Sequence, residues 1–312
     1  IIGCGSAYHV GFVAGYFMRA ALRIPVESVL ASEFRYDDPI VDENTLAIVI
    51  SQSGETLDTL YGLREAKKHG AKTIAIVNVV GSTIATESDD VLYTWAGPEI
   101  SVASTKAYST QLAVIYLLAL YIGEQLGKFT QEQLSAYIAA LEKLPEQIDE
   151  MLKHKENIQF FASKYFNASD MYFIGRNVDY AASLEASLKL KEISYIHSEA
   201  YAAGELKHGT IALISDGTPV VALCCREELL GKMISGIEEV KARGAKVLAV
   251  ARSGERRILA AADDVIYVPG TEPLFDAIAE IVPLQLLAYY AAREKGCDID
   301  KPRNLAKSVT VE

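Results

Sequence analysis

The sequence has few of the residues on which metal sites and disulfide frameworks depend. Its 312 residues include four cysteines and five histidines, and the cysteines show no C-x-x-C spacing. A zinc site is therefore not expected, and we predict neither a metal nor a cofactor. Cys224 and Cys225 are adjacent within an apolar run, where cysteine usually serves as a small buried hydrophobe. This cysteine usage indicates a reduced, cytoplasmic compartment.

The chain also lacks an excess of basic residues and an apolar run long enough to cross a bilayer. Lys and Arg number 30 against 41 Asp and Glu, a net charge of −11, whereas nucleic-acid phosphates are bound by basic surfaces. The most apolar helical stretch, residues 112–123, is shorter than the roughly 20 residues of a membrane span and is predicted to be a core helix. No signal peptide is visible. We predict neither a nucleic acid nor a membrane as partner.

An initiator methionine is absent as well. The chain opens on Ile1-Ile2-Gly3, which reads as the middle of a strand, so we expect a piece of a longer protein. Its length suits two domains of about 150 residues each. Half of the residues are hydrophobic and 23% are charged, a composition typical of proteins with sizeable cores.

Short β-branched runs alternate with longer helical patterns along the whole chain. This alternation predicts an α/β fold with parallel sheets connected by helices. The predicted strands are 45–50, 73–78 and 91–94 in the first half, and 171–174, 219–224, 246–251 and 265–268 in the second.

The two halves repeat one another. "EAKKHGAKTIAIVNV" from Glu65 matches "EVKARGAKVLAVARS" from Glu239, and "DDVLYTWAGPE" from Asp89 matches "DDVIYVPGTEP" from Asp263. A third pair, "IIGCGSAYH" and "YFIGRNVDY", recurs in the same order, so that the repeats lie about 172 to 174 positions apart. The chain is therefore predicted to hold two copies of one three-layer αβα domain with flavodoxin-like or Rossmann-like topology.

The repeat divides the chain into four segments. Residues 1–129 form the first domain and residues 162–295 the second. Residues 130–161 are polar with apolar residues at helical spacing, which predicts a helical linker or hairpin. The tail, 296–312, has no strong periodicity, and such tails are usually frayed.

A turn rich in hydroxyl groups follows the predicted strand 45–50. The run Ser51-Gln52-Ser53-Gly54-Glu55-Thr56 lies between that strand and a helix that begins near Leu57. Free backbone N–H groups and the positive end of the helix dipole meet at such a turn, and anions bind there. The spacing is not that of a Walker motif, so a phosphomonoester on a small molecule is favoured over a nucleoside triphosphate. The alternative is that Ser, Gly and Thr only cap the helix and turn the chain.

The second copy carries no such turn. After the matching strand it reads Arg226-Glu227-Glu228, with two carboxylates and no hydroxyl group, which would repel phosphate. We therefore expect one sugar-phosphate site per chain. The loop Gly3-Cys4-Gly5-Ser6-Ala7 also joins a strand to a helix, but it lacks the third glycine of a dinucleotide fingerprint, so NAD is not expected.

The stretch "YAASLEASLKLKEISYIHSEAYAAGELKHGT" from Tyr180 is unusual. Glu185, Lys189 and Glu192 share one face of a helix that is otherwise small and apolar. Either a solvated stripe of salt bridges or a functional cluster fits this pattern. His208 follows in a glycine-flanked loop, where a role in moving protons is consistent with its titration near neutral pH.

Several motifs of the sequence resemble those of a known family. The markers are "ASEFRYDDP", "SQSGET", "VASTKAY", "LKLKEISYIHSEAYAAGELKHG" and "PRNLAKSVTVE". Together they resemble the isomerase half of the glucosamine-6-phosphate synthases (glutamine–fructose-6-phosphate aminotransferases), which consists of two SIS (sugar isomerase) domains. The resemblance covers the whole chain and implies an enzyme that converts fructose 6-phosphate to glucosamine 6-phosphate.

The resemblance assigns roles to individual residues. Glu192 is implied as the base that moves a proton between C1 and C2, and Lys307 as the lysine that forms a Schiff base. His208 is implied as the ring-opening acid–base, reaching in from the second subunit of a homodimer, and Lys189 as a supporting lysine. The implied substrate and phosphate contacts are Ser6, Ser51, Gln52, Ser53, Thr56, Val102, Ser104 and Ala306. The tail is then expected to fold over the sugar.

The implied chemistry needs these residue types, and the chain departs from the family in two places. A Schiff-base lysine must lose its proton, through burial or a cationic neighbour. Ala7 stands where the family usually has a second hydroxyl group, so one contact is missing or shifted. The N-terminal glutaminase domain, the source of ammonia, is absent, so we expect isomerisation to glucose 6-phosphate or amination by free ammonia. A fructosamine-phosphate deglycase and a non-catalytic sugar-phosphate sensor are the alternatives.

Overall fold

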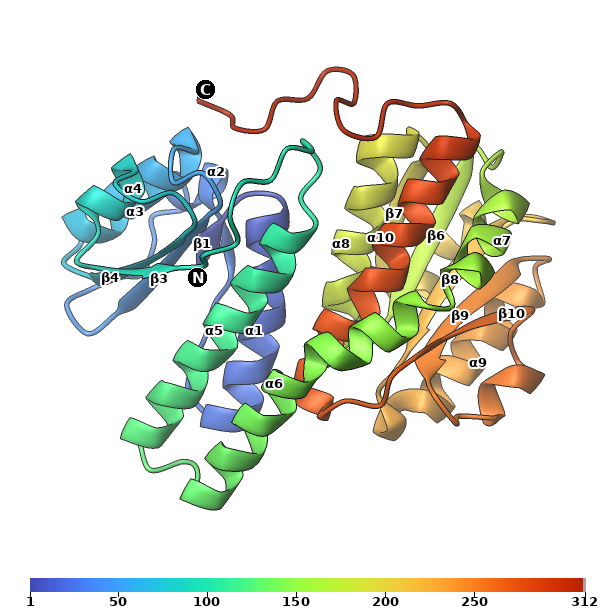
Figure 1. The fold of residues 1–312 in the computed structure, drawn as a ribbon, viewed down its shortest axis with the longest axis horizontal. Coiled ribbons are helices and arrows are strands. Elements are labelled where there is room, and N and C mark those ends of the chain that lie inside the picture. The colour runs from blue at the N-terminus through green and yellow to red at the C-terminus, as the bar shows by residue number, and fades with distance from the viewer. Residues whose placement is uncertain (311–312) are drawn as a thin grey trace. The chain divides into compact units, whose positions relative to one another are not determined.

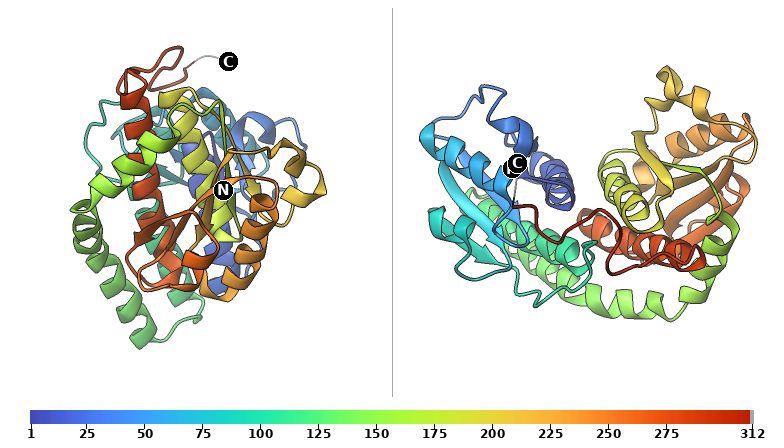
Figure 2. Two further views of the ribbon diagram at one scale, coloured as in Figure 1. Left: turned by 90° about the vertical axis from the view of Figure 1, so that its right-hand side faces the viewer. Right: turned by 90° about the horizontal axis from the view of Figure 1, so that it is seen from above.

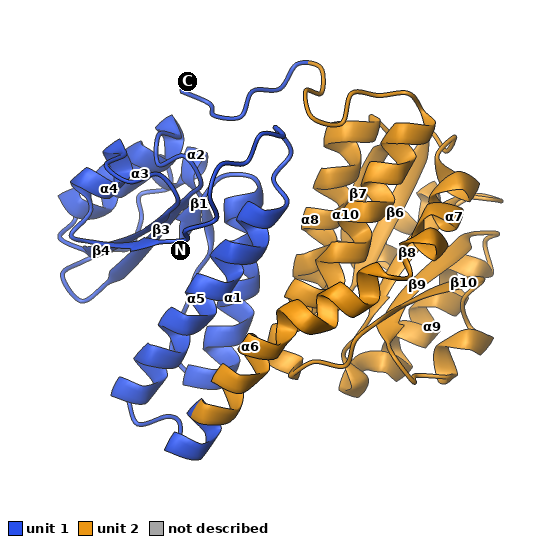
Figure 3. Cartoon of the chain, in the orientation of Figure 1, with its two compact units in different colours: residues 1–134, 304–312 blue, residues 135–303 orange. Residues whose placement is uncertain are grey.

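The structure is a computed structural model that describes residues 1–310. Residues 311 and 312, the end of the predicted tail, lie outside the described residues. The chain divides into two compact units: residues 1–134 with 304–312, and residues 135–303 (Figure 3).

Unit 1 contains a five-stranded parallel sheet. Its strands are β1 (Ile2–Gly3), β2 (Val29–Leu30), β3 (Leu46–Ser51), β4 (Lys72–Val77) and β5 (Asp90–Tyr93), in the order β2-β1-β3-β4-β5. Its helices are α1 (Ser6–Leu22), α2 (Ala31–Phe34), α3 (Leu57–Lys68), α4 (Thr83–Glu87) and α5 (Lys106–Gln125) (Figure 1). This strand order is that of flavodoxin-like doubly wound folds.

Unit 2 repeats this arrangement. Its strands are β6 (Asp170–Gly175), β7 (His197–Ala202), β8 (Pro219–Cys224), β9 (Lys246–Arg252) and β10 (Asp264–Val268), in the order β10-β9-β8-β6-β7. Its helices are α7 (Lys155–Tyr165), α8 (Val178–Ser194), α9 (Leu230–Lys241) and α10 (Asp276–Glu294), preceded by α6 (Gln131–Leu152), which begins at the end of unit 1. Short 3-10 helices lie at Leu206–His208 (η1), Thr210–Leu213 (η2), Glu227–Leu229 (η3), Arg257–Ala260 (η4) and Pro273–Phe275 (η5).

Each sheet is covered by helices on both faces. Successive side chains of a strand point to opposite faces, so a strand buried on both sides is continuously apolar. In β3, Ala47 and Val49 pack with Leu60 and Leu63 of α3 in one cluster. In unit 2, α9 packs on one face of the sheet, and α8, α10 and α7 lie together in the other layer (Figure 2).

The predicted α/β class and the internal repeat are confirmed, because both sheets are parallel and have the same strand order. Seven predicted strands occur within one residue of their expected positions. The short edge strand β2 and the edge strand β7, with the sequence His-Ser-Glu-Ala-Tyr-Ala, were not predicted. An edge strand is paired on one side and needs no continuous apolar run, which removes the signal. The predicted helical linker, residues 130–161, contains α6 and the first part of α7.

One helical segment of the described residues is long and apolar enough to cross a membrane by length and composition. It is Pro273–Glu294, which contains α10, and 72% of its most apolar 18-residue window is buried inside the structure. Residues 112–123, the most apolar helical stretch by sequence, lie within α5. A buried core helix passes the same test.

Candidate active site

The hydroxyl-rich turn lies at the carboxyl edge of the sheet in unit 1. β1 and β3 are parallel neighbours, with Ile2 opposite Val49. The chain leaves β1 toward β2 on one side and β3 toward β4 on the other, so the strand order reverses between them. Ligands of open α/β sheets bind at this switch point. The loop that leads into α1 at Ser6 and the loop 52–56 both begin there.

The turn is held in shape by its own hydroxyl groups. The hydroxyls of Ser51 and Thr56 hydrogen-bond to each other at 3.0 Å, and the backbone N–H of Gly54 donates to Ser51 Oγ at 3.0 Å. The N–H of Glu55 donates to Ser53 Oγ at 3.1 Å. Thr56 is the N-cap residue of α3 but makes no side-chain capping bond. The hydroxyl groups of Ser51 and Ser53 therefore turn the chain, as the alternative interpretation expects, whereas the Thr56 side chain does not cap α3.

Position 54 requires glycine because of its backbone conformation and because of its close neighbours. Its φ of +68° lies in the left-handed region, and a Cβ built there would lie 2.0 Å from Ser82 Oγ. The Gly54 carbonyl also accepts the N–H of Ile84 at 3.0 Å, and the carboxylate of Glu55 accepts the N–H and hydroxyl of Thr83. The loop after β3 is thus fastened to the start of α4.

Two residues of the tail contact this turn and the helix that follows it. Ser308 Oγ donates to Ser53 Oγ at 3.2 Å, and the backbone N–H of Leu57, at the start of α3, donates to the carbonyl of Val309 at 3.2 Å. The tail carbonyl therefore satisfies one of the N–H groups that a helix leaves unpaired at its N-terminus. The expectation of a frayed tail is wrong for these residues.

Lys307, next to Ser308, is held by a carboxylate. Its Nζ donates to Glu99 Oε2 at 2.5 Å and to the carbonyl of Ser101 at 2.8 Å. The Lys307 side chain is 31% exposed and that of Glu99 is 5% exposed. The sequence led us to expect that burial or a cationic neighbour would lower the pKa of Lys307. Its contacts within the described residues are instead a carboxylate and a carbonyl.

The other predicted contacts of unit 1 lie in the same loops. Ser6 is the first residue of α1, after Gly5. Val102 and Ser104 are half-buried in the loop between β5 and α5, and Ala306 is exposed on the tail. Gln52 Oε1 accepts the side-chain amide of the buried Gln111 of α5 at 3.5 Å.

In unit 2, α8 carries a buried row of charges. Lys189 Nζ lies 2.5 Å from Glu192 Oε2 and 3.4 Å from Glu185 Oε1. The side chains of Lys189 and Glu185 are 2% and 0% exposed, whereas that of Glu192 is 20% exposed. The interpretation as a solvated stripe is therefore wrong. Burial alone would lower the pKa of Lys189, but the two carboxylates outweigh it and raise that pKa above its usual value.

His208 is exposed at the end of η1, the short helix after β7. Its backbone N–H donates to the Glu205 carbonyl at 2.9 Å, and the following Gly209 has a φ of +146°. Its exposure agrees with the sequence expectation that it is not a core histidine.

The chain matches a known domain twice. A sequence profile of the SIS domain matches residues 1–121 and residues 164–295. These two segments contain the two sheets described above. The chain belongs to the SIS domain family.

Among its relatives, this SIS protein is 56% identical over 312 residues to a glutamine–fructose-6-phosphate aminotransferase (isomerizing) of Caldanaerobacter subterraneus subsp. tengcongensis, with 100% of this chain and 51% of the relative covered. The chain thus spans about half the length of the curated relatives it matches. The C-terminal domain of glucosamine-fructose-6-phosphate aminotransferase from Francisella tularensis superposes with a TM-score of 0.93 at 37% identity, covering 96% of this chain and 86% of that one. A glucosamine-6-phosphate deaminase from Thermotoga maritima superposes with a TM-score of 0.78 at 27% identity, covering 99% and 89%.

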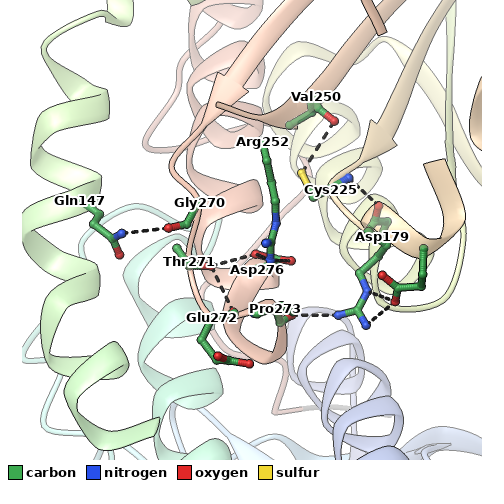
Figure 4. Close-up of polar contacts among 12 residues, drawn as sticks. Gln147, Asp179, Cys225, Val250, Arg252, Gly270, Thr271, Glu272, Pro273 and Asp276 are labelled. Atoms are coloured by element: carbon green, nitrogen blue, oxygen red, sulfur yellow. Dashed lines mark hydrogen bonds and ion pairs between the residues drawn. The ribbon is translucent and has the colours of Figure 1, made fainter. Parts of the chain in front are cut away.

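The second SIS copy has a carboxylate where the first has hydroxyl groups. Asp179, in the first turn of α8, accepts the backbone N–H of Cys225 at 2.9 Å, directly after β8 (Figure 4). Arg226 donates to Glu228 and to the carbonyl of Pro273. The N–H group that an anion would need is thus occupied by the chain's own carboxyl group, which supports one phosphate site per chain.

Sequence reasoning missed three residues of these SIS copies. Glu185 was seen on the helix face but given no role, although it lies buried beside Lys189. The contact of Glu99 with Lys307 could not be predicted from the sequence, because 208 positions separate the two residues. Asp179 could have been found from the repeat, because placing Gly3 opposite Gly175 puts it opposite Ala7, next to Ser6.

Proposed function

We propose that this chain is a sugar-phosphate isomerase that converts fructose 6-phosphate to glucose 6-phosphate. Given ammonia from a glutaminase domain, it forms glucosamine 6-phosphate. The observation that carries the proposal is the hydrogen bond between Ser308 and Ser53, because it joins the segment that bears Lys307 to the phosphate-type turn. Membership of the SIS family and the similarity to isomerizing aminotransferases support the same reaction.

The phosphate is proposed to bind at the turn after β3. Ser51, Ser53 and Thr56 supply hydroxyl donors, and the N-terminus of α3 supplies the positive end of a helix dipole. Gln52, Ser6 and the loop with Val102 and Ser104 are proposed to contact the phosphate or the sugar, together with Ala306. This binding would replace some of the bonds that the hydroxyl groups now make to one another.

The chemistry is proposed to need four side chains. His208 opens the sugar ring, and the amine of Lys307 then attacks the exposed C2 carbonyl, losing water to give an iminium. The iminium acidifies the C1 protons, and Glu192 carries one of them to C2. Lys189 holds Glu192 through the ion pair at 2.5 Å. Hydrolysis of the Schiff base releases the aldose.

We also propose a homodimer in which His208 serves the site of the partner subunit, and a cytoplasmic location in keeping with the free cysteines. A fructosamine-phosphate deglycase would share the turn and the sugar but cleave an amine adduct. A sugar-phosphate sensor would bind without turnover and would not need Glu192 or Lys307.

The test is incubation of the chain with fructose 6-phosphate, with and without ammonium, followed by NMR of the sugar phosphates. A Lys307→Ala variant is run in parallel. We expect glucose 6-phosphate from the unaltered chain, glucosamine 6-phosphate when ammonium is present, and neither from the variant. Saturable binding with no conversion in either condition would overturn the isomerase proposal in favour of the sensor.

A further inference from the structure

Glu99 is a buried charged group to which the proposed reaction gives no role. Glu99 lies in the loop between β5 and α5, and its side chain is 5% exposed. Its Oε1 accepts the backbone N–H groups of Thr105 at 2.9 Å and Ala107 at 3.3 Å, at the start of α5. Its Oε2 contacts Lys307 Nζ at 2.5 Å.

The two oxygens of Glu99 therefore face two different partners. One oxygen is fixed by the N-terminus of α5, which holds the carboxyl group in a single orientation. The other is directed at the amine of the tail. The carbonyl of Ser101 contacts the same amine at 2.8 Å, so the Lys307 amine is held between two acceptors of one loop.

This arrangement is at odds with the state in which a lysine reacts. An ammonium group has no free electron pair, so a proton must leave Lys307 before its nitrogen can bond to carbon. Burial and a cationic neighbour are two ways to favour the loss of that proton, but the contacts of Lys307 within residues 1–310 are a carboxylate and a carbonyl. A group in contact that accepts the proton is a third way.

We propose that Glu99 is a positioning residue for Lys307, which holds the amine at the substrate loop and takes up the proton that the amine must lose. This inference rests on the proposed Schiff-base role of Lys307. It adds a proton acceptor to that role and assigns the acceptor to a residue 208 positions away in the sequence.

The proton balance closes within this pair. Glu99 takes one proton from the ammonium, and the neutral amine attacks C2 of the open-chain ketose, so that the N–C2 bond forms. A second proton moves from nitrogen to the former carbonyl oxygen. Glu99 then returns its proton to that hydroxyl, the C2–O bond breaks, water leaves, and the iminium keeps one N–H and the positive charge. Glu99 ends as the carboxylate it was.

The pKa of Glu99 depends on the charge of Lys307. Burial acts to raise its pKa, but the hydrogen bonds from Lys307 and from the N–H of Thr105, with the charge of Lys307, outweigh burial and leave the pKa below its usual value. When Lys307 becomes neutral, its charge no longer opposes burial. The protonated form of Glu99 is then less disfavoured than it is beside the ammonium group.

A purely structural role for Glu99 makes a different prediction. If the carboxylate only anchors the tail, its loss lowers the reactivity of Lys307 by the same factor at every pH. If it accepts the proton, its loss is most severe near neutral pH. The deficit then shrinks in alkali, where hydroxide ions of the solvent take over the deprotonation.

The experiment measures adduct formation at Lys307 directly. The chain is incubated with fructose 6-phosphate and cyanoborohydride from pH 6 to 10, and the reduced adduct on the peptide with Lys307 is followed by mass spectrometry. The variants are Glu99→Gln, Glu99→Asp and, as a matched control, Glu87→Gln, which removes a carboxylate paired with Arg64 elsewhere in unit 1. Circular dichroism of each variant reports folding, and Glu99→Asp serves as the test if Glu99→Gln does not fold.

We expect Glu99→Gln to slow adduct formation about 100-fold at pH 7 and to reach nearly the rate of the unaltered chain at pH 10. Glu87→Gln is expected to form the adduct at the rate of the unaltered chain at every pH. Glu99→Asp is expected to regain part of the rate with the pH profile of the unaltered chain. The role of Glu99 is overturned if the unaltered chain and the Glu99 variants form the adduct equally fast. It is also overturned if the variants are slower by the same factor at every pH. The absence of any adduct on the unaltered chain instead refutes the proposed function of Lys307.

Discussion

The carboxylate of Asp179 accepts the backbone N–H of Cys225 at 2.9 Å, inside the second SIS copy. Asp179 is 1% exposed, and Asp276 and Glu280 are buried nearby on α10. Asp276 is paired with Arg252, whose NH2 group donates to both of its oxygens (Figure 4). Burial is the largest cause that raises the pKa of Asp179 from 3.8 to about 7, and the charge of Asp276 adds to it.

This buried carboxyl group makes the stability depend on pH. Between its unfolded pKa of 3.8 and its folded pKa of about 7, the folded state holds a proton that the unfolded state has lost. Stability therefore falls as the pH rises through this window. We expect urea unfolding from pH 4 to 7 to show that the free energy of unfolding of the unaltered chain falls relative to that of Asp179→Asn. Parallel curves would show that Asp179 does not titrate in this window.

Asp42→Asn is a control of opposite sign. Asp42 is exposed, and hydrogen bonds from the N–H of Asn44 and the hydroxyl of Thr45 lower its pKa. Its contribution is present above the unfolded pKa and is lost as the pH falls. The difference in the free energy of unfolding between Asp42→Asn and the unaltered chain is therefore expected to shrink as the pH falls.

Replacement of Gly54 by alanine is expected to destabilise the chain and to weaken binding of fructose 6-phosphate. The left-handed φ alone costs alanine about 1–2 kcal/mol, and the added Cβ would lie 2.0 Å from Ser82 Oγ. Thermal unfolding and a binding titration check both effects. Gly231→Ala is the control, since a Cβ there meets nothing within 4 Å and alanine favours the helix α9. Equal stability of the two variants would contradict the strain at Gly54.

Lys189→Met is expected to cost about 3–5 kcal/mol of folding free energy, because it removes a buried cation from between two carboxylates. Lys153→Met is a matched control, since it breaks an exposed pair with Glu150 and is expected to change nothing measurable. Urea unfolding distinguishes them. Wild-type stability in Lys189→Met would mean that the ion pairs of α8 do not stabilise the fold.

Ser53→Ala is expected to raise the KM for fructose 6-phosphate about tenfold, the effect of one hydrogen bond to a charged group, while kcat changes less. Steady-state assays of Ser53→Ala are compared with those of Ser235→Ala on α9, whose hydroxyl donates within its own helix to Gly231. A fall in kcat with an unchanged KM would place the role of Ser53 outside phosphate binding.

The proposed sharing of His208 is open to a complementation test. His208→Ala and Lys307→Ala are each expected to be inactive. In a two-fold symmetric dimer an equal mixture, once subunits exchange, is expected to regain about a quarter of full activity, because half of the dimers then contain one complete site. No recovery despite exchange would show that His208 acts within its own chain.

Much of this protein could be predicted from local patterns. Alternating apolar runs and helical periods gave the α/β class, and the match between Glu65 and Glu239 gave the repeat, because both depend on residues close in sequence. The turn from Ser51 to Thr56 could be found for the same reason. Its hydroxyl groups, its glycine and the helix start follow one another within six positions.

Contacts between distant positions were decided by the tertiary structure alone. The sequence determined that Glu185, Lys189 and Glu192 share a helix face, since that follows from the helical period. Whether the face is solvated depends on what packs against α8, and the structure buries Glu185 and Lys189 almost completely. Likewise the sequence supplied Lys307 and Glu99, but only folding brings an amine and a carboxylate 208 positions apart to 2.5 Å. Burial and long-range proximity arise from packing, and no local period encodes them.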